Sequence, residues 1–451
     1  MQARAVWHPV VSRVTTSLTD IAPPPLPERG LDVWFVGNRS ALFWLALKSG
    51  FWTVLSLGFY RFWMKTRLRR WYWSAIRPGG HPLEYVGDPW EKLLGFFIAV
   101  VILTFYIGIV NLLLMFVSFS LFQNSVVGYF GSVLGVIPIW FYAQYRARRY
   151  VLARTRWRGV RFGLETGAWG YAWRALVHWL ITICTLGLLW PRMTFWLEKY
   201  KTDRTFFGSA KLVQGGRWTM LYRATVPFAV ALALTAGFVC WLVWFDPLIP
   251  DSSAPLADIL SSFDEPGTLG FAVLGWQGIW RLILLGPLAL GLIYGAVHYR
   301  FVSKRIMADH KHCAGVEMRS KLNGLRISMI YVLGTTIAYS ILVFGILGIV
   351  GVAFGLLGSG AFLEAQIGTA DPFGDLPRWL SVGIVAVLYL AVFLFWGVLH
   401  HAFVTYPLMR HMAVTLGLVN VAGLAQVSQR ARDEFTEAEG FAEALDLGAA
   451  I

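Results

Sequence analysis

The sequence is poor in charged residues. Asp, Glu, Lys and Arg together make up 14% of the 451 residues, whereas soluble globular proteins carry roughly 25%. Hydrophobic residues make up 57%. Apolar stretches of about 18 residues or more recur, and each is long enough to cross a hydrocarbon layer about 30 Å thick. The composition therefore excludes an ordinary soluble domain and predicts a polytopic integral membrane protein.

Cysteine is scarce, and motifs of catalysis and metal binding are missing. The three cysteines, Cys184, Cys240 and Cys313, show no Cys-x-x-Cys spacing, so neither a disulfide framework nor a zinc site is predicted. His310 and His312 lie beside Cys313, but adjacent ligands without a second cluster are more typical of a solvated basic loop. No P-loop, His-Glu-x-x-His, Gly-x-Ser-x-Gly or dinucleotide fingerprint occurs. We therefore predict no catalytic residue, no metal site and no cofactor.

The first part of the chain lacks the apolar core of a signal peptide. Residues 1–40 are polar and contain several prolines, so no cleavable signal peptide is predicted, and residues 1–32 are expected to form a flexible arm. Eight apolar stretches follow, at about 41–63, 92–119, 126–145, 170–190, 219–245, 272–298, 328–356 and 380–403.

Basic residues gather between some of these stretches and are missing between others. Segments 61–92, 146–161, 192–217 and 300–326 are rich in Lys and Arg, whereas 246–275 contains acids and neither Lys nor Arg. Segment 357–379 has only Arg378 against Glu364, Asp371 and Asp375. The positive-inside rule places the basic segments in the cytoplasm and these other two outside. Topology therefore explains the net charge of +14, and nucleic-acid binding is not predicted.

The stretch 170–190 is flanked by basic segments on both sides, which bears on whether it crosses the membrane. A full crossing would place its two basic flanks on opposite sides of the membrane, whereas a hairpin that enters and returns keeps both inside. The stretch contains Arg174, His178, Gly187 and Pro191, and glycine and proline permit a break in a helix. We therefore predict a re-entrant or interfacial hairpin here.

The stretch 41–63 has the same character, with Lys48 inside it and Gly58 near its end. We predict an all-α polytopic membrane protein with six transmembrane helices, two re-entrant or interfacial helical hairpins, short cytoplasmic β elements and both termini in the cytoplasm. Eight full crossings are the alternative. Ionisable groups at membrane depth usually face protein or water. The candidate path residues are therefore Lys48, Gly58, Arg174, His178, Gly187 and Pro191, although Arg174 also has the length to snorkel to the interface.

The two hairpins belong to a longer internal repeat, in which a Phe-x-Gly stretch precedes the hairpin and a basic aromatic segment and two crossings follow it. The expected organisation is repeat 1 at 33–145, repeat 2 at 146–298, a degenerate repeat 3 with two crossings at 299–427, and an acidic cytoplasmic tail at 428–451. Each copy crosses an even number of times. The copies should therefore share one orientation, related by an axis along the membrane normal.

The repeated motifs resemble those of the YjgN-like family, bacterial inner-membrane proteins of unknown function. That family pairs Phe-x-Gly with a Thr-Leu-Gly-x-Tyr-x-Pro-Trp-x-Lys block. The matching runs are Phe35-Val36-Gly37-Asn38-Arg39 with Leu57-Gly58-Phe59-Tyr60-Arg61-Phe62-Trp63-Met64-Lys65, and Arg161-Phe162-Gly163 with Thr185-Leu186-Gly187-Leu188-Leu189-Trp190-Pro191. Ser56 and Phe62 depart from the usual Thr and Pro. The resemblance implies a location in the bacterial inner membrane and supplies no catalytic residue.

The basic aromatic segments suit the headgroup layer, because Trp prefers that depth and each Arg attracts anionic lipid by about 1 kcal/mol. The candidate lipid contacts are Arg67, Arg69, Arg70, Trp71, Trp73, Arg146, Arg148 and Arg149. The expected partners are anionic membrane lipids, with a second copy or an envelope protein as a further option. The sequence favours a transporter, channel-like or lipid-handling protein with a path between the repeats. A non-catalytic membrane scaffold is the alternative, and an enzyme acting on lipid ranks last.

Overall fold

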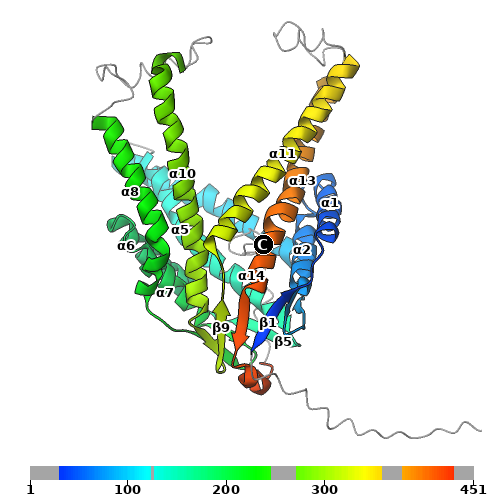
Figure 1. Cartoon of the computed structure of the whole chain (residues 1–451), viewed down its shortest axis with the longest axis vertical. Coiled ribbons are helices and arrows are strands. Elements are labelled where there is room, and N and C mark those ends of the chain that lie inside the picture. Colours follow the sequence, from blue (N-terminus) through cyan, green and yellow to red (C-terminus); the bar gives the residue numbers. More distant parts are fainter. Residues whose placement is uncertain (1–29, 123–125, 245–270, 358–377, 431–451) are drawn as a thin grey trace, which may run out of the picture.

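A small sheet lies toward one end of the molecule, and the α-helices extend from it toward the other end (Figure 1). The computed structural model describes residues 30–122, 126–244, 271–357 and 378–430. Most of the expected N-terminal arm, most of the acidic tail and most of the two segments expected outside the cytoplasm fall beyond these residues.

The sheet has ten short antiparallel strands in a nearly closed, barrel-like ring. Their order is β2-β1-β10-β9-β8-β7-β6-β5-β4-β3, so strands that are consecutive in the chain pair with each other except for β2 and β3, and β1 pairs with β10. The two ends of the order, β2 and β3, are consecutive in the chain. The strands are β1 (Leu31–Phe35), β2 (Ile76–Pro78), β3 (Leu83–Tyr85), β4 (Thr155–Trp157), β5 (Val160–Leu164), β6 (Thr205–Phe207), β7 (Ala210–Gln214), β8 (Lys311–Cys313), β9 (Val316–Ser320) and β10 (Leu416–Val419).

Tight turns join the strands on the outer side of the ring. Arg158 and Gly159 connect β4 to β5 with φ of 51° and 80°, and Ala314 and Gly315 connect β8 to β9 with φ of 50° and 78°. Two consecutive residues at positive φ are typical of a type I′ turn, whose twist matches that of antiparallel strands. Local turn chemistry therefore fixes the register of these two hairpins.

Helix pairs make the connections on the opposite side of the ring, so that tight turns and helix pairs alternate. Five pairs leave and rejoin neighbouring strands. They are α1 (Arg39–Leu55) with α2 (Arg61–Ala75), α3 (Pro89–Phe105) and α4 (Asn111–Phe122) with α5 (Val126–Ala153), α6 (Ala168–Cys184) with α7 (Trp190–Thr202), α8 (Tyr222–Trp244) with α10 (Phe271–Ala308), and α11 (Gly324–Leu357) with α13 (Arg378–His400) and α14 (Tyr406–Val414).

The two short pairs, α1/α2 and α6/α7, end in the same turn. Leu57 and Gly58 have φ of 52° and 94°, and Leu186 and Gly187 have φ of 50° and 85°. The Gly58 amide donates to the Thr53 carbonyl, and the Gly187 amide donates to the Thr182 carbonyl, each at 2.8 Å. These bonds, six residues back to one, terminate a helix by the Schellman pattern, which requires a left-handed residue and favours glycine. The two pairs are thus locally equivalent.

The three long pairs carry the apolar helices. Among the described residues, five helical segments are long and apolar enough to cross a membrane: Pro89–Leu121, Trp218–Leu242, Ile283–Ala308, Gly324–Gly348 and Tyr389–Val414. Few of their residues are buried inside the protein, and the pair α8/α10 diverges from the pair α11/α13 with distance from the sheet (Figure 1). Long apolar helices with little burial suit a lipid solvent, so the chain is a membrane protein.

The predicted all-α class with short β elements is wrong, because the ten strands form one sheet to which every helix pair is attached. The count of six transmembrane helices is also corrected to five candidate spans within the described residues, and α5, which holds the expected crossing 126–145, is not one of them. Strands of three to five residues are too short to show a clear alternation of apolar and polar residues, which is why the sequence did not reveal the sheet.

The inside of the ring is a hydrophobic core. Leu31, Trp157, Phe207 and Cys313 come from strands on different sides of the ring and form one cluster with Val421. Val421 lies in a short 3₁₀ helix, Val421–Gln426, which packs under the sheet, and burial raises the pKa of the Cys313 thiol. Side chains therefore fill the ring.

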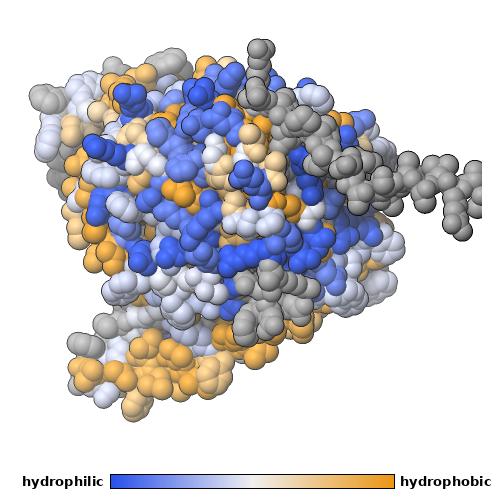
Figure 2. All heavy atoms as spheres, turned by 90° about the horizontal axis from the view of Figure 1, so that it is seen from below, coloured by the Kyte–Doolittle hydropathy of each residue, from blue (hydrophilic) through white to orange (hydrophobic). Residues whose placement is uncertain are grey.

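The C-terminal segment is tied to this end of the sheet by hydrogen bonds. The Ser209 amide donates to the Ser428 carbonyl at 2.8 Å, and the Ser428 amide donates to the Ser209 hydroxyl at 3.1 Å. Seen from below, this end of the molecule is largely hydrophilic, whereas hydrophobic residues dominate at the margin (Figure 2). The sheet end is therefore the water-facing end.

The shared turn leads to a first prediction. Replacing Gly187 with Ala adds a Cβ that meets no atom within 4 Å but sits at positive φ, which costs about 1–2 kcal/mol for an L-residue. We expect a lower midpoint of thermal unfolding in detergent. Gly237→Ala is the matched control, because its Cβ also meets nothing within 4 Å, its φ is helical, and Ala is favoured over Gly in a helix by about 1 kcal/mol. Equal midpoints for the two variants would contradict the left-handed turn.

Candidate anion-binding site

The residues predicted to line a path lie on the two short helix pairs and do not form one site. Gly58 and Gly187 are at the ends of the pairs, with open space around them. Lys48 is exposed on α1, and Pro191 is buried in the first turn of α7. The structure thus leaves their role in a path untested.

Arg174 and His178 share a helix, yet they bind different partners. The Arg174 Nη1 donates to the Gly170 carbonyl at 3.0 Å, and its guanidinium lies 4.8 Å from the centre of the Tyr200 ring. His178 Nδ1 lies 3.4 Å from Arg192 Nη1. Burial, followed by repulsion from the Arg192 and Arg174 charges, lowers the pKa of His178. His178 therefore stays neutral at neutral pH.

The predicted lipid-contact residues lie at the bases of α2 and α5, and most of them bind protein groups. Arg69 Nη1 donates to the Tyr85 hydroxyl at 3.3 Å, Arg70 Nη2 to the Gly87 carbonyl at 2.8 Å, and Trp73 Nε1 to the Thr155 hydroxyl at 3.0 Å. In α2, Trp71 packs against Phe35 and Tyr406, and Arg67 lies exposed over the Tyr60 ring. In α5, Arg146 donates to the Tyr142 hydroxyl, Arg148 pairs with Glu198, and Arg149 is buried. Their contact with lipid stays a prediction.

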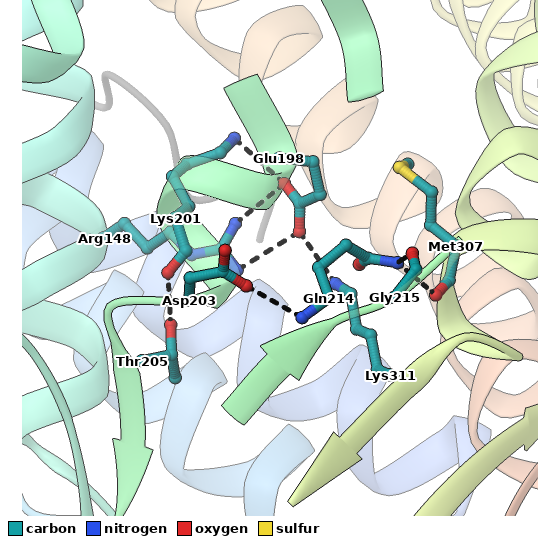
Figure 3. A network of polar contacts seen from close by, with 9 residues as sticks. All are labelled: Arg148, Glu198, Lys201, Asp203, Thr205, Gln214, Gly215, Met307 and Lys311. Carbon is teal, nitrogen blue, oxygen red and sulfur yellow. Dashed lines mark hydrogen bonds and ion pairs between the residues drawn. The ribbon is translucent and has the colours of Figure 1, made fainter. Parts of the chain in front are cut away.

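A cluster of charges around one carboxylate joins three helix pairs where they meet the sheet (Figure 3). Glu198 of α7 forms ion pairs with Arg148 of α5 at 3.3 Å, Lys201 of α7 at 3.1 Å and Lys311 of β8 at 2.9 Å. Burial raises the pKa of Glu198, but attraction to Arg148, Lys311 and Lys201 outweighs it and holds the pKa well below the usual range. Glu198 is therefore ionised at neutral pH.

Backbone and amide contacts hold this cluster in place. The Gln214 amide nitrogen of β7 donates to Asp203 at 2.8 Å, and the Gln214 side chain donates to the carbonyls of Gly215 and Met307 at 3.1 and 3.0 Å. The Thr205 hydroxyl donates to the Lys201 carbonyl at 2.8 Å. These bonds join α7 and β7 to the end of α10, as Figure 3 shows. The charged side chains thus project from a rigid frame.

The cluster contains more positive than negative charge. Lys304 of α10 interacts electrostatically with Glu198, Lys201 and Arg148, and Arg300 lies one helical turn before it. Arg300 and Lys304 are both exposed, and their charged groups lie 5.9 Å and 5.3 Å from the centre of the Phe301 ring. We define the Glu198 cluster as Arg148, Glu198, Lys201, Arg300, Lys304 and Lys311. Five cations against one carboxylate suit an oxyanion such as phosphate.

A second group of cations supports the first long helix pair. Arg69 and Lys92 are each only 1% exposed, and both lie 5.2 Å from the centre of the Tyr85 ring. Beside them, Glu91 accepts hydrogen bonds from Arg154 at 2.8 Å and from Tyr150 at 2.9 Å. Ring faces and one carboxylate stabilise these buried cations. This group anchors α2, α3 and α5 to the sheet.

Sequence reasoning missed most of the Glu198 cluster. Arg148 was named as a lipid contact, but Glu198, Lys201, Arg300, Lys304 and Lys311 were not singled out. One signal was present, because Glu198 and Asp203 are the acids of the otherwise basic segment 192–217. Within the described residues there is no group of three or more His, Cys, Asp or Glu side chains that could hold a metal ion.

Comparison with known families agrees with the repeated motifs. Residues 31–347 match the family described as bacterial protein of unknown function (DUF898), which covers more than half of the chain. The chain belongs to this family. The match confirms the YjgN-like resemblance and extends from β1 into α11. No curated protein and no solved structure shows a significant match to this DUF898 protein.

The Glu198 cluster leads to a second prediction. Glu198→Gln leaves Arg148, Lys201 and Lys311 without their shared counter-charge, and because these pairs are only partly buried the loss should lie between the values for exposed and fully buried pairs, at about 2 kcal/mol. Lys211→Gln is the control, because it removes an exposed pair with Glu165 worth less than about 1 kcal/mol. Denaturant unfolding in detergent compares the two. Equal losses would contradict a structural role for Glu198.

The lowered pKa of Glu198 adds a pH dependence to that comparison. A carboxyl whose pKa is lowered by folding stabilises the protein fully above the ordinary value of 4.5, and this stabilisation is lost as pH falls toward the lowered pKa. The stability difference between the wild type and Glu198→Gln should therefore be constant near neutral pH and shrink in acid. A difference that grew on acidification would contradict the assignment.

Proposed function

We propose that this DUF898 protein handles lipid in the bacterial inner membrane by binding an anionic phospholipid. The phosphate would contact the exposed cations of the Glu198 cluster, and the acyl chains would lie along the apolar faces of the long helices. The sheet and the Glu198 cluster would face the cytoplasm, as the positive-inside rule predicts. A transporter or a channel-like protein is a finer assignment that the fold favours less.

The observation that carries the proposal is the excess of positive charge directly below exposed apolar helices. Arg300 and Lys304 follow the apolar part of α10 and are exposed. They lie beside Glu198, whose negative charge is already balanced by its ion pairs with other cations. Higher on the same pair, Leu234 and Leu290 are about 60% exposed. A lipid with an anionic headgroup satisfies both requirements, because each nearby cation contributes about 1 kcal/mol and apolar helices need hydrocarbon around them.

The hydrophobic core of the ring argues against a channel along its axis. Trp157, Phe207 and Val421 pack together inside the sheet, so apolar side chains occupy the position that a polar path would need. A scaffold role remains the second candidate, and the hydrophilic sheet end is the surface that a soluble partner or another envelope protein would contact (Figure 2).

The proposal predicts selective binding of anionic lipid that depends on two cations. Arg300→Gln with Lys304→Gln removes two charges, which should weaken binding of phosphatidylglycerol by about 2 kcal/mol, or roughly 30-fold. Purified protein in nanodiscs, titrated with anionic and zwitterionic lipid and followed by native mass spectrometry, measures the preference.

A matched double variant keeps this test specific. Lys211→Gln with Arg319→Gln also removes two positive charges, but from exposed pairs on the sheet with Glu165 and Glu317. We expect this control to retain the preference for anionic lipid. The same loss in both double variants would mean that the net charge, and not the Glu198 cluster, attracts lipid; no preference in the wild type would refute the proposal.

A further inference from the structure

The ends of the two short helix pairs expose large apolar side chains. Leu57 is 86% exposed at the end of α1/α2, and Leu186 is 97% exposed at the end of α6/α7. Phe59 and Leu188, two residues further along, are 51% and 69% exposed. We call these four residues the hairpin tips. Exposed apolar residues gathered at a turn need a partner, because loops in water are normally polar.

Each short pair leaves the sheet and returns to it. The α1/α2 pair connects β1 to β2, and the α6/α7 pair connects β5 to β6. These strands are direct neighbours in the sheet, with Trp34 opposite Arg77 and Gly163 opposite Phe206. Each short helix pair therefore both starts and ends on the sheet side, and its tip is the point farthest from the sheet.

Contacts with the long helices show how far the tips extend. The Phe59 ring lies 6.4 Å from the ring of Phe97, which is seven residues beyond Trp90 in the candidate span Pro89–Leu121, or about 10 Å along the helix. The Tyr222 hydroxyl donates to the Leu188 carbonyl at 2.9 Å, and Tyr222 is four residues into the candidate span Trp218–Leu242. Both tips reach the first turns of a candidate span, which is less than half of a hydrocarbon layer about 30 Å thick.

From this geometry we infer that both hairpin tips insert into the hydrocarbon of one leaflet, the leaflet on the sheet side, and go no deeper. The occupant of this apolar surface is membrane lipid, because the tips touch helices that are themselves candidate spans. Burying a leucine side chain contributes about 1.5–3 kcal/mol, so Leu57 and Leu186 supply a substantial anchor. This inference does not depend on selectivity for anionic lipid.

Polar groups in the turns are paired within the protein, as hydrocarbon requires. The Ser56 hydroxyl accepts from the Tyr60 amide at 2.8 Å, and the equivalent Thr185 hydroxyl accepts from the Leu189 amide at 3.4 Å. Thr185 also donates to the Ile181 carbonyl at 2.8 Å. A hydroxyl residue immediately before Leu-Gly therefore has a physical role in both copies.

Charged residues set the depth of insertion. Lys48 lies nine residues before Leu57, and Arg174 lies twelve residues before Leu186, which places them about 14 Å and 18 Å below the tips. That distance corresponds to the headgroup region. Nearer to the tips, Arg61 is the first residue of α2 and Arg192 is the third residue of α7, and an Arg side chain is long enough to extend from there toward the headgroups. Deeper insertion would carry these charges into hydrocarbon.

Depth-dependent quenching tests the inference. Leu57→Cys and Leu186→Cys, each in a background with Cys184, Cys240 and Cys313 replaced by Ala, are labelled with an environment-sensitive fluorophore in full-length protein in phosphatidylcholine vesicles. Since both positions are almost fully exposed, the substitutions remove little packing. We expect a blue-shifted emission that is quenched more by a nitroxide near the headgroup end of the acyl chain than by one at the chain terminus.

Two control positions calibrate the depth. Glu84→Cys is exposed on β3 and should be quenched by aqueous iodide alone, whereas Ile102→Cys, twelve residues beyond Trp90 on α3 and 55% exposed, should respond best to the deep nitroxide. Tip labels that behave like Glu84 would show that the hairpins lie in water. Tip labels that behave like Ile102 would show that they reach the bilayer centre. Either result would overturn insertion into a single leaflet.

Discussion

Pairing between β1 and β10 is the contact on which the rest of the structure depends. It places Leu31 opposite Leu418 and joins the two ends of the described chain, so that the last helix pair becomes a neighbour of the first. Without this ladder the ring would be an open sheet with two further unpaired edges, which proteins normally avoid. The hydrophobic core would also lose the wall that Leu31 and Leu418 supply. Every helix pair starts and ends on this ring, so the ring determines their order and their common direction.

Polarity changes in three steps with distance from the ring. A hydrophobic core fills the ring. The helix bases carry a layer of cations with few acids, and the helices beyond that layer are apolar and expose many of their side chains. The cations survive burial because each has a specific partner: Glu198 serves three of them, the Tyr85 ring faces two, and Glu91 binds Arg154. One carboxylate shared among several cations leaves positive potential beside the apolar region. That combination is the physical basis of our proposal that the protein binds an anionic lipid headgroup.

Local features of this fold could be predicted from the sequence, and long-range features could not. Glycine after leucine at 58 and 187 marked the two helix breaks, because a left-handed residue is needed there. The sheet escaped prediction because its strands are three to five residues long and β1 pairs with β10 across almost the whole chain. The Glu198 cluster escaped for the same reason: Arg148 and Lys311 lie 50 and 113 residues away from Glu198. The continuous pairing of the strands from β4 to β8 brings them together.

The order of helix pairs around the ring gives the molecule an unequal relation to the two leaflets. Going from β1 to β10, the pairs are short, long, short, long and long, so each short pair lies between two long ones. The short pairs and the Glu198 cluster share the sheet side, whereas the candidate spans alone extend beyond it. If the hairpin tips insert as we propose, a lipid on the sheet side would meet cations and hairpin tips together, whereas a lipid on the far side would meet only separated apolar helices. This difference between the two sides is the reason why the proposed lipid binding is placed in the sheet-side leaflet.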